Sequence, residues 1–275
     1  MKLRKNIGKF TTYFLLIVVS IIFLFPVLWL ILATFSKEGS IYSFNGFFPT
    51  VFSFDTIVKL FTDTSLYNYP RWLLNTLIIA VSSSLISTTL VTLSAYTISR
   101  FKFKNRKKLM KLGLVLNMFP AFMATTAVYI LMTQFKMINH LYGLIIVYSG
   151  TASLGYLVQK GYFDSIPTAI YEAATLDGAS NFRQFISITL PLAKPIIVYT
   201  ALTTFTWPWS DYILPELILK DRDLWTVAVG LMNLPETEFA RFAAGAIFVA
   251  TPIVILYFCL VRNLVSGLSA GAVKS

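Results

Sequence analysis

Long charge-free apolar runs dominate the chain and lack the polar stripe that an amphipathic surface helix would show. A helix needs about 20 residues to cross a hydrocarbon core of about 30 Å. Five runs reach that length, and a sixth reaches it only if a helix starting at Pro195 continues past Asp211. The pattern therefore predicts an all-α integral membrane protein with about six transmembrane helices, over residues 10–34, 72–98, 112–133, 140–159, 195–217 and 242–261.

The composition agrees with a membrane protein and disfavours several other classes. Of the 275 residues, 56% are apolar and 13% are charged, whereas soluble domains have about 45–50% and about 25%. The formal charge of +11 lies in short basic blocks beside the apolar runs, which is typical of topology determinants and not of a nucleic-acid surface. One cysteine, Cys259, and one histidine, His140, allow neither a disulfide framework nor a His/Cys metal site. We expect no cofactor and no partner nucleic acid.

Lysine and arginine are distributed unevenly over the segments between the predicted helices. Sixteen of the 23 fall on the side that carries both termini, residues 100–111 and the segment between the fourth and fifth helices. By the positive-inside rule, both termini are predicted to be cytoplasmic, which agrees with an even number of spans. The external segments 37–71 and 212–241 are too short for independent domains, so residues 1–275 are predicted to form one transmembrane domain.

Polar groups within the predicted spans leave several alternatives open. No charged residue lies in the middle of the five secure spans, which disfavours ion-coupled transport. Asp211 either belongs to a solute pathway or outer gate or marks the outer end of the fifth helix. His140 is an interfacial residue or a proton relay. The hydroxyl residues of the second, fourth and fifth spans either pack helices together or line a path for a neutral solute.

The segment 163–192, between the fourth and fifth predicted helices, carries the most specific pattern. Pro167 suits the first turn of a helix that runs to Asp177 and stops at Gly178 in a left-handed conformation. Asn181 and Gln184 resemble a capping box that opens a second helix, which the prolines at 191 and 195 limit. We therefore expect a short helix–turn–helix across the inner face of the membrane.

The first helix of this segment is a candidate docking surface. Its small residues Ala173 and Ala174 would let another surface approach the backbone, and Glu172 offers a charge to an Arg or Lys of a partner. The alternative is an amphipathic connector that lies at the membrane surface without a partner.

Residues 172–179, followed by Phe185, Ile188, Leu190 and Pro191, resemble the EAA loop of membrane subunits of bacterial ATP-binding-cassette importers. The spacing from Glu172 to Pro191 is fully kept, and we call residues 163–192 the EAA-like loop. The resemblance extends over nearly the whole chain. Residues 240–245 and 267–274 are most similar to the carbohydrate branch, especially the smaller permease subunit of maltose/maltodextrin importers.

The resemblance implies a multi-pass permease subunit in the inner or plasma membrane of a bacterium. It implies a heterodimer with a second permease subunit, a cytoplasmic ATPase dimer, and an extracellular or periplasmic solute-binding protein. It assigns coupling to the ATPase to these residues: Glu172, Ala173, Ala174, Asp177, Gly178, Ala179, Leu190 and Pro191. It assigns a contact with the ATPase dimer to the tail, at Gly267, Gly271 and Lys274. ATP hydrolysis is expected in the separate subunit, and this chain is expected to have no catalytic residue.

The expected function is the import of a carbohydrate, such as maltodextrin or another oligosaccharide, by alternating access. The first alternative is a permease for glycerol phosphate or another small polar solute. Phosphate recognition would need Arg or Lys facing the pathway, and the secure spans offer none. The second alternative, a membrane-embedded enzyme or a membrane scaffold, would need convergent catalytic groups or another partner surface, which the sequence does not indicate.

Overall fold

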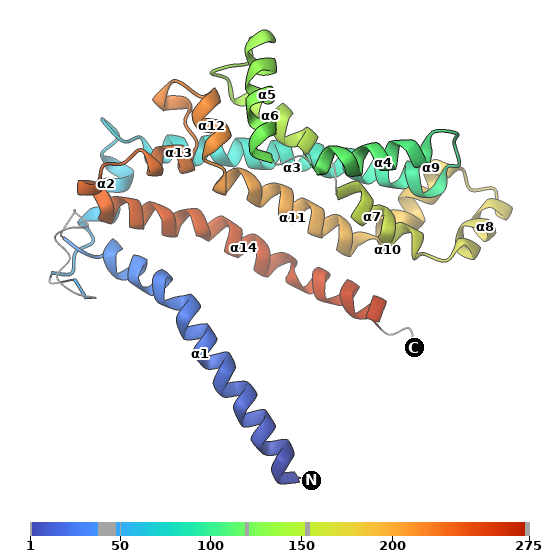
Figure 1. Ribbon diagram of the computed structural model, residues 1–275, viewed down its shortest axis with the longest axis horizontal. Helices are drawn as coiled ribbons and strands as arrows, with labels where there is room; N and C mark the ends of the chain where they lie inside the picture. The colour runs from blue at the N-terminus through green and yellow to red at the C-terminus, as the bar shows by residue number, and fades with distance from the viewer. Residues whose placement is uncertain (1, 38–47, 50, 119–120, 152–154, 273–275) are drawn as a thin grey trace. The chain divides into compact units, whose positions relative to one another are not determined.

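A computed structural model describes residues 2–37, 48–49, 51–118, 121–151 and 155–272 (Figure 1). In these ranges the chain is helical, apart from turns and an isolated bridge between Ser36 and Phe52. The long helices are α1 (Lys2–Thr34), α3 (Tyr69–Arg100), α11 (Lys194–Ser210) and α14 (Phe239–Ala272). The shorter ones outside the EAA-like loop are α2 (Asp55–Thr62), α4 (Arg106–Asn117), α5 (Ala121–Gln134), α6 (Leu141–Thr151), α7 (Gly155–Asp164), α12 (Ile213–Ile218) and α13 (Val227–Met232).

Three described helices are long and apolar enough to cross a membrane: Thr11–Thr34 within α1, Tyr69–Arg100, and Glu236–Val261 at the start of α14. Two bent pairs also qualify if each counts as one span, α6 with α7 at 41° and Asn181–Leu192 with α11 at 78°. The side chains of α1 are exposed along the apolar window, as expected of a helix that faces lipid or a partner chain. The all-α prediction is confirmed for the described residues, with three to five candidate spans.

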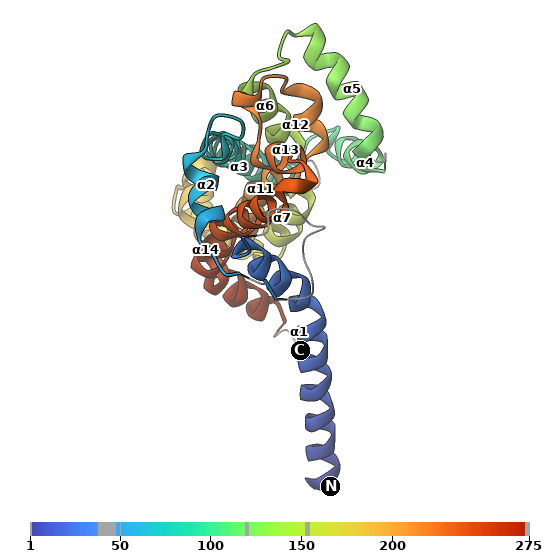
Figure 2. The same ribbon diagram turned by 90° about the vertical axis from the view of Figure 1, so that its left-hand side faces the viewer.

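The third predicted helix, over residues 112–133, is not a single helix in the structure. Instead, α4 ends at Asn117 and α5 begins at Ala121, and the two helices run in different directions in Figure 1 and Figure 2. Pro120 stands between them in the sequence. A proline disfavours the helical conformation of the residue before it, which explains why one apolar run gives two helices.

The fifth predicted helix is also shorter than expected. It ends at Ser210, and Asp211 has an extended backbone (φ −77°, ψ 118°). A separate helix, α12, then runs from Ile213 to Ile218. In a continuous helix Pro215 would clash with the carbonyl group of Asp211 and could not donate a hydrogen bond to it. The expectation of one helix over 195–217 is therefore wrong.

The chain divides into two compact units, Met1–Pro70 with Leu231–Ala250 and Arg71–Gly230 with Thr251–Ser275. In the first unit, the buried Arg241 guanidinium pairs with Asp63 (3.1 Å) and Glu238 (3.2 Å). Hydrogen bonds from the Ser65 hydroxyl and from Arg241 lower the pKa of the Asp63 carboxyl below its usual value. The Tyr69 hydroxyl donates to the carbonyl oxygen of Gly245 (2.9 Å). These contacts fasten the segment between α2 and α3 to the start of α14.

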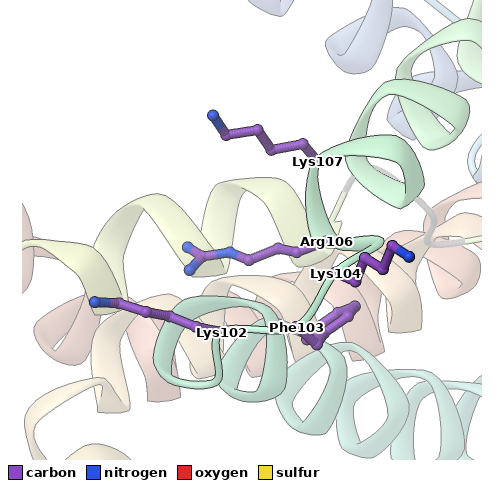
Figure 3. Close-up of a pocket in the computed structure, with 5 residues that line it drawn as sticks. All are labelled: Lys102, Phe103, Lys104, Arg106 and Lys107. Atoms are coloured by element: carbon purple, nitrogen blue, oxygen red, sulfur yellow. The ribbon is translucent and has the colours of Figure 1, made fainter.

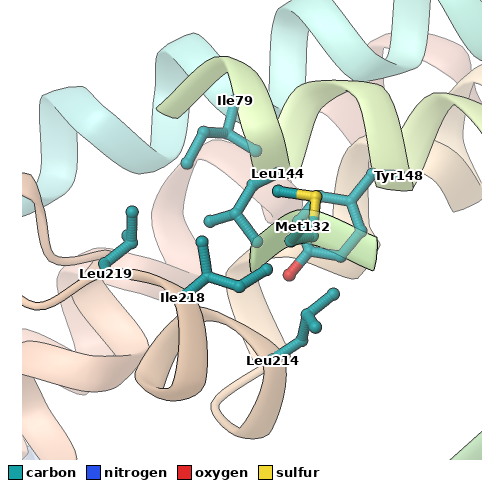
Figure 4. Packing of buried hydrophobic residues seen from close by; sticks show 7 residues of the cluster. All are labelled: Ile79, Met132, Leu144, Tyr148, Leu214, Ile218 and Leu219. Atoms are coloured by element: carbon teal, nitrogen blue, oxygen red, sulfur yellow. The ribbon is translucent and has the colours of Figure 1, made fainter. Parts of the chain in front are cut away.

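In the second unit, the first turns of α3 hold the segment after α12. Trp72 Nε1 donates to the Arg222 carbonyl (2.8 Å), and Asn75 Nδ2 donates to the Asp223 (2.8 Å) and Trp225 (3.0 Å) carbonyls. These three bonds join side chains of α3 to backbone carbonyls of the segment, so residues 222–225 are fixed on α3. Beside them lies an apolar cluster contributed by α3, α5, α6 and the α12 region (Figure 4): Ile79, Met132, Leu144, Tyr148, Leu214, Ile218 and Leu219.

Hydroxyl groups join α3 to α11. Ser84 Oγ donates to the Ala201 carbonyl (2.9 Å), and Thr204 Oγ1 donates to Ser84 Oγ (3.2 Å). Gln159 of α7, fully buried, donates to Thr200 Oγ1 (2.7 Å). For Ser84 and Thr204 these bonds favour the interpretation that the hydroxyls pack helices together.

The contact between Gly230 and Trp72 provides a test of this packing. A Cβ atom at Gly230 would overlap the indole ring of Trp72, so Gly230→Ala should destabilise the protein by about 1–3 kcal/mol. We expect a lower melting temperature for the purified variant in detergent. Gly161→Ala is the matched control, because a Cβ there meets nothing within 4 Å and alanine favours a helix. Equal melting of both variants would contradict the packing described.

Candidate functional site

Within the EAA-like loop, the first helix after the end of α7 is α8 (Thr168–Leu176). Pro167 is its N-cap residue, with φ −54° and ψ 130°, and its carbonyl accepts a hydrogen bond from Ile170 N (3.2 Å). Pro167 therefore precedes the helix, one position earlier than the sequence pattern predicts. The rigid φ angle of proline still sets the direction in which the chain enters α8.

The end of α8 is formed by Gly178, as predicted. Its φ angle is +79°, in the left-handed region where glycine has no Cβ penalty. Gly178 N donates to the Thr175 carbonyl (3.0 Å), and Ala179 N donates to the Ala174 carbonyl (2.9 Å). These two bonds define a Schellman motif, which satisfies the last carbonyl groups of the helix and reverses the chain.

The second helix, α9 (Asn181–Gln184), is capped by Ser180 and not by Asn181. The Ser180 hydroxyl accepts a hydrogen bond from Arg183 N (3.3 Å). The predicted capping box is thus wrong. Serine is as good an N-cap residue as asparagine, so the sequence was equally compatible with a cap at Ser180.

Gln184 connects the two helices instead of closing a capping box. Its buried Nε2 donates to Thr175 Oγ1 (2.9 Å) and to the Ala179 carbonyl (3.0 Å). The chain continues through a π-helical turn, η2 (Phe185–Thr189), and α10 (Leu190–Leu192). Inserted π turns are frequent at functional sites and shift the side chains that follow.

Tyr171 anchors α8 to the rest of the second unit. Its hydroxyl lies 2.9 Å from Thr189 Oγ1, and the Arg100 guanidinium stacks 3.7 Å above its ring. Arg100 Nη2 also donates to the Phe163 carbonyl (2.5 Å). At the end of α3, the Tyr96 hydroxyl donates to the Asn181 carbonyl (3.0 Å). The loop is therefore held by α3 and α7, through residues that the local sequence pattern did not indicate.

The opposite surface of the loop is exposed. Glu172, Ala173, Asp177 and Gly178 are exposed, as is Pro191, whereas Ala174, Ala179 and Leu190 are half-buried. Two apolar side chains between them also point outward: Leu176 is 89% exposed and Phe182 is 73% exposed. A carboxylate beside large exposed apolar groups, on a backbone fixed from behind, is suited to binding another protein.

The remaining predicted positions lie elsewhere. Gly267 and Gly271 belong to the last turns of α14, and Lys274 lies outside the described residues.

Asp211 is the C-cap residue of α11, and one carboxylate oxygen accepts a hydrogen bond from the Tyr148 hydroxyl (2.9 Å). Its other oxygen lies 3.4 Å from Leu214 N, at the start of α12. This position favours the interpretation that Asp211 ends the helix.

The apolar helices and the exposed loop are consistent with an integral membrane permease. The chain belongs to the family described as the inner membrane component of binding-protein-dependent transport systems, whose model matches residues 3–270.

Curated relatives cover the whole length of the chain. The maltodextrin transport system permease protein MalD of Streptococcus pneumoniae is 38% identical over 99% of this chain and 98% of its own. The galactooligosaccharides transport system permease protein GanQ of Bacillus subtilis is 37% identical over 100% of this chain and 98% of its own. These relatives are transport subunits and not enzymes.

Solved structures have the same fold. A chain of a bacterial ABC transporter involved in the import of the acidic polysaccharide alginate superimposes with a TM-score of 0.78, at 20% identity, over 94% of this chain and 96% of that one. A chain of the alginate transporter in complex with an alginate pentasaccharide-bound periplasmic protein gives a TM-score of 0.69, at 18% identity, over 96% and 99%.

The turn at Gly178 can be tested without any partner. Gly178→Val places a β-branched residue in the left-handed region, which costs roughly 1–2 kcal/mol or more. We expect amide hydrogen exchange in residues 174–179 to accelerate by about 5–30-fold. Gly178→Asn is the control, because asparagine tolerates this conformation, and its exchange should stay near that of the parent chain. Unchanged exchange in the valine variant would show that the turn is not formed.

Proposed function

We propose that this chain is the permease subunit of an ATP-driven, binding-protein-dependent carbohydrate importer, whose solute is a maltodextrin or another oligosaccharide. The chain forms half of the translocation pathway and couples by alternating access to a cytoplasmic ATPase. The observation that carries this proposal is the EAA-like loop, whose fixed backbone presents Glu172, Leu176 and Phe182 outward. The relatives named for maltodextrin and galactooligosaccharides support the choice of solute.

The ATPase docks on the exposed surface of α8 and on the turn at Gly178. Leu176 and Phe182 supply apolar contact area, and Glu172 pairs with a basic residue of the ATPase. Ala173 and Ala174 allow close approach, while Ala179 and Leu190 support the surface from behind. Because Tyr171 and Gln184 tie the loop to itself and to α3, a displacement of the docked subunit moves α3 and α7 with it.

In the proposed membrane arrangement, the chain crosses the membrane six times, and both termini and the EAA-like loop lie in the cytoplasm. Five of the proposed crossings are the candidate spans α1, α3, α6 with α7, α11 and α14, and α4 with α5 is proposed as the remaining one. Residues 1–275 act as one permease domain in the plasma membrane of a bacterium. Asp211 lies at the outer end of the fifth crossing, where it caps the helix, and Gly267, Gly271 and Lys274 contact the ATPase dimer.

The other partners are a second permease subunit and an extracellular or periplasmic solute-binding protein. Six helices enclose too little volume for a separate pathway, so a heterodimer completes the pore. The alginate transporter complex, which includes a periplasmic protein carrying its saccharide, supports an assembly of this kind.

The docking role of Glu172 is tested by reversing its charge. Glu172→Lys replaces attraction by repulsion at a contact that binding desolvates, so association with the ATPase should weaken at least tenfold. Membrane insertion should be unchanged, while solute-stimulated ATP hydrolysis and uptake are lost. Co-purification of the ATPase and uptake into reconstituted vesicles measure these effects.

Thr175→Ser is the matched control for this variant. Serine keeps the hydroxyl that donates to the Tyr171 carbonyl and accepts from Gln184, so docking and uptake should be nearly unchanged. Normal uptake by Glu172→Lys with its ATPase fully bound would reduce the loop to a connector.

The proposed orientation is tested by thiol labelling in a Cys259→Ser background. A cysteine at Asn105, beside the basic residues between α3 and α4, should resist an impermeant maleimide in intact cells. A cysteine at Leu66, in the exposed segment between α2 and α3, should react. Ready labelling at position 105 would overturn the orientation, and permeabilised cells control for access to both sites.

A further inference from the structure

A basic pocket lies where the chain passes from α3 into α4. It has a volume of about 470 Å³ and is lined by five neighbouring residues (Figure 3): Lys102, Phe103, Lys104, Arg106 and Lys107. All but the half-buried Arg106 are exposed. The side chains of Lys102 and Arg106 extend in the same direction in Figure 3. Four cations within six residues repel one another unless an anion lies between them.

The surrounding residues supply little compensating negative charge. The three ion pairs found among the described residues involve none of the pocket lysines. The positive charge of Arg106 attracts the Asp164 carboxylate. That carboxylate already pairs with Lys160 and accepts a hydrogen bond from Ser99 (2.6 Å). The first turn of α4 contains no acidic residue, and its N-cap, Asn105, makes no side-chain cap. Arg106 and Lys107 belong to this first turn, at the positive end of the helix dipole, which increases the attraction for an anion.

An apolar surface begins directly beyond the cations. Along α4, none of whose residues is buried, Leu109, Leu112 and Leu116 are exposed at helical spacing. The ring of Phe103 forms part of the pocket itself. An inorganic anion would use only the basic residues, whereas a molecule with an anionic head and apolar chains would cover both surfaces.

We propose that this pocket binds the phosphate headgroup of an anionic glycerophospholipid, with the acyl chains lying along α4. Clusters of four or more Lys and Arg residues next to a membrane helix attract anionic lipids, and each basic residue adds to the attraction. The lipid offsets the repulsion between Lys102, Lys104, Arg106 and Lys107 and so stabilises the start of α4. This binding does not depend on the assignment of the EAA-like loop.

The test is lipid binding by the purified full chain in detergent, measured by native mass spectrometry. Phosphatidylglycerol and phosphatidylcholine with the same acyl chains are titrated separately, and soluble glycerol phosphate is added as a competitor. We expect preferential retention of phosphatidylglycerol that the soluble headgroup does not displace. The variant Lys102→Gln/Lys104→Gln/Lys107→Gln should lose this preference by roughly a hundredfold.

Two further variants distinguish lipid binding at this pocket from a general effect of the positive charge of the chain. Lys9→Gln/Arg183→Gln/Lys194→Gln removes the same charge from exposed positions outside the pocket and should keep the preference. Lys102→Arg/Lys104→Arg/Lys107→Arg keeps the charge and should restore binding. Equal retention of both lipids, or equal loss in the two glutamine variants, would overturn the proposal. Full displacement by glycerol phosphate would identify a pocket for a soluble anion and overturn the lipid assignment. Far-ultraviolet circular dichroism confirms that each variant is folded.

Discussion

The polar contacts at the two ends of α3 are the constraint on which the second unit depends. At one end, Trp72 and Asn75 bind the backbone of residues 222–225, and Thr76 accepts a hydrogen bond from Val227 N (2.8 Å). At the other end, Tyr96 and Arg100 bind the EAA-like loop. A 32-residue helix is about 48 Å long, enough to cross a bilayer. Under the proposed coupling, a displacement of the loop would reach the segment at the far end of α3 through this one helix.

The loop itself combines a fixed backbone with an exposed surface. The bonds made by Tyr171 and Gln184 and the turn at Gly178 order it before any partner binds. A preordered surface loses less conformational entropy on association, so more of the contact free energy appears as affinity. The same ordered backbone holds Leu176 and Phe182, which are 89% and 73% exposed, in place for a partner. The proposed coupling also requires such rigidity, because a flexible loop would absorb the movement of a docked subunit.

Sequence patterns correctly predicted the structural features that depend only on neighbouring residues. The long apolar runs gave α1, α3 and α14, because a bilayer requires long helices with satisfied backbone groups. The left-handed turn at Gly178 was predicted because glycine has no Cβ and ends helices in this conformation. The break between α11 and α12 was missed, since hydropathy ignores the missing N–H and the ring clash of Pro215. Ser180 and Asn181 are both good N-cap residues, so the pattern could not choose between them. The stack of Arg100 on Tyr171 joins residues far apart in sequence, and only the tertiary structure reveals it.

The most direct test of the coupling role is photocrosslinking from the loop in living cells. A photoreactive phenylalanine analogue at Leu176, which is 89% exposed at the end of α8, should form a covalent product with an ATP-binding subunit. The same analogue at Leu66, which is exposed between α2 and α3, should not form that product. The yield at position 176 should also fall when Glu172→Lys is introduced beside it. Crosslinks from position 176 to lipid alone, in cells that carry the complete importer, would contradict the account.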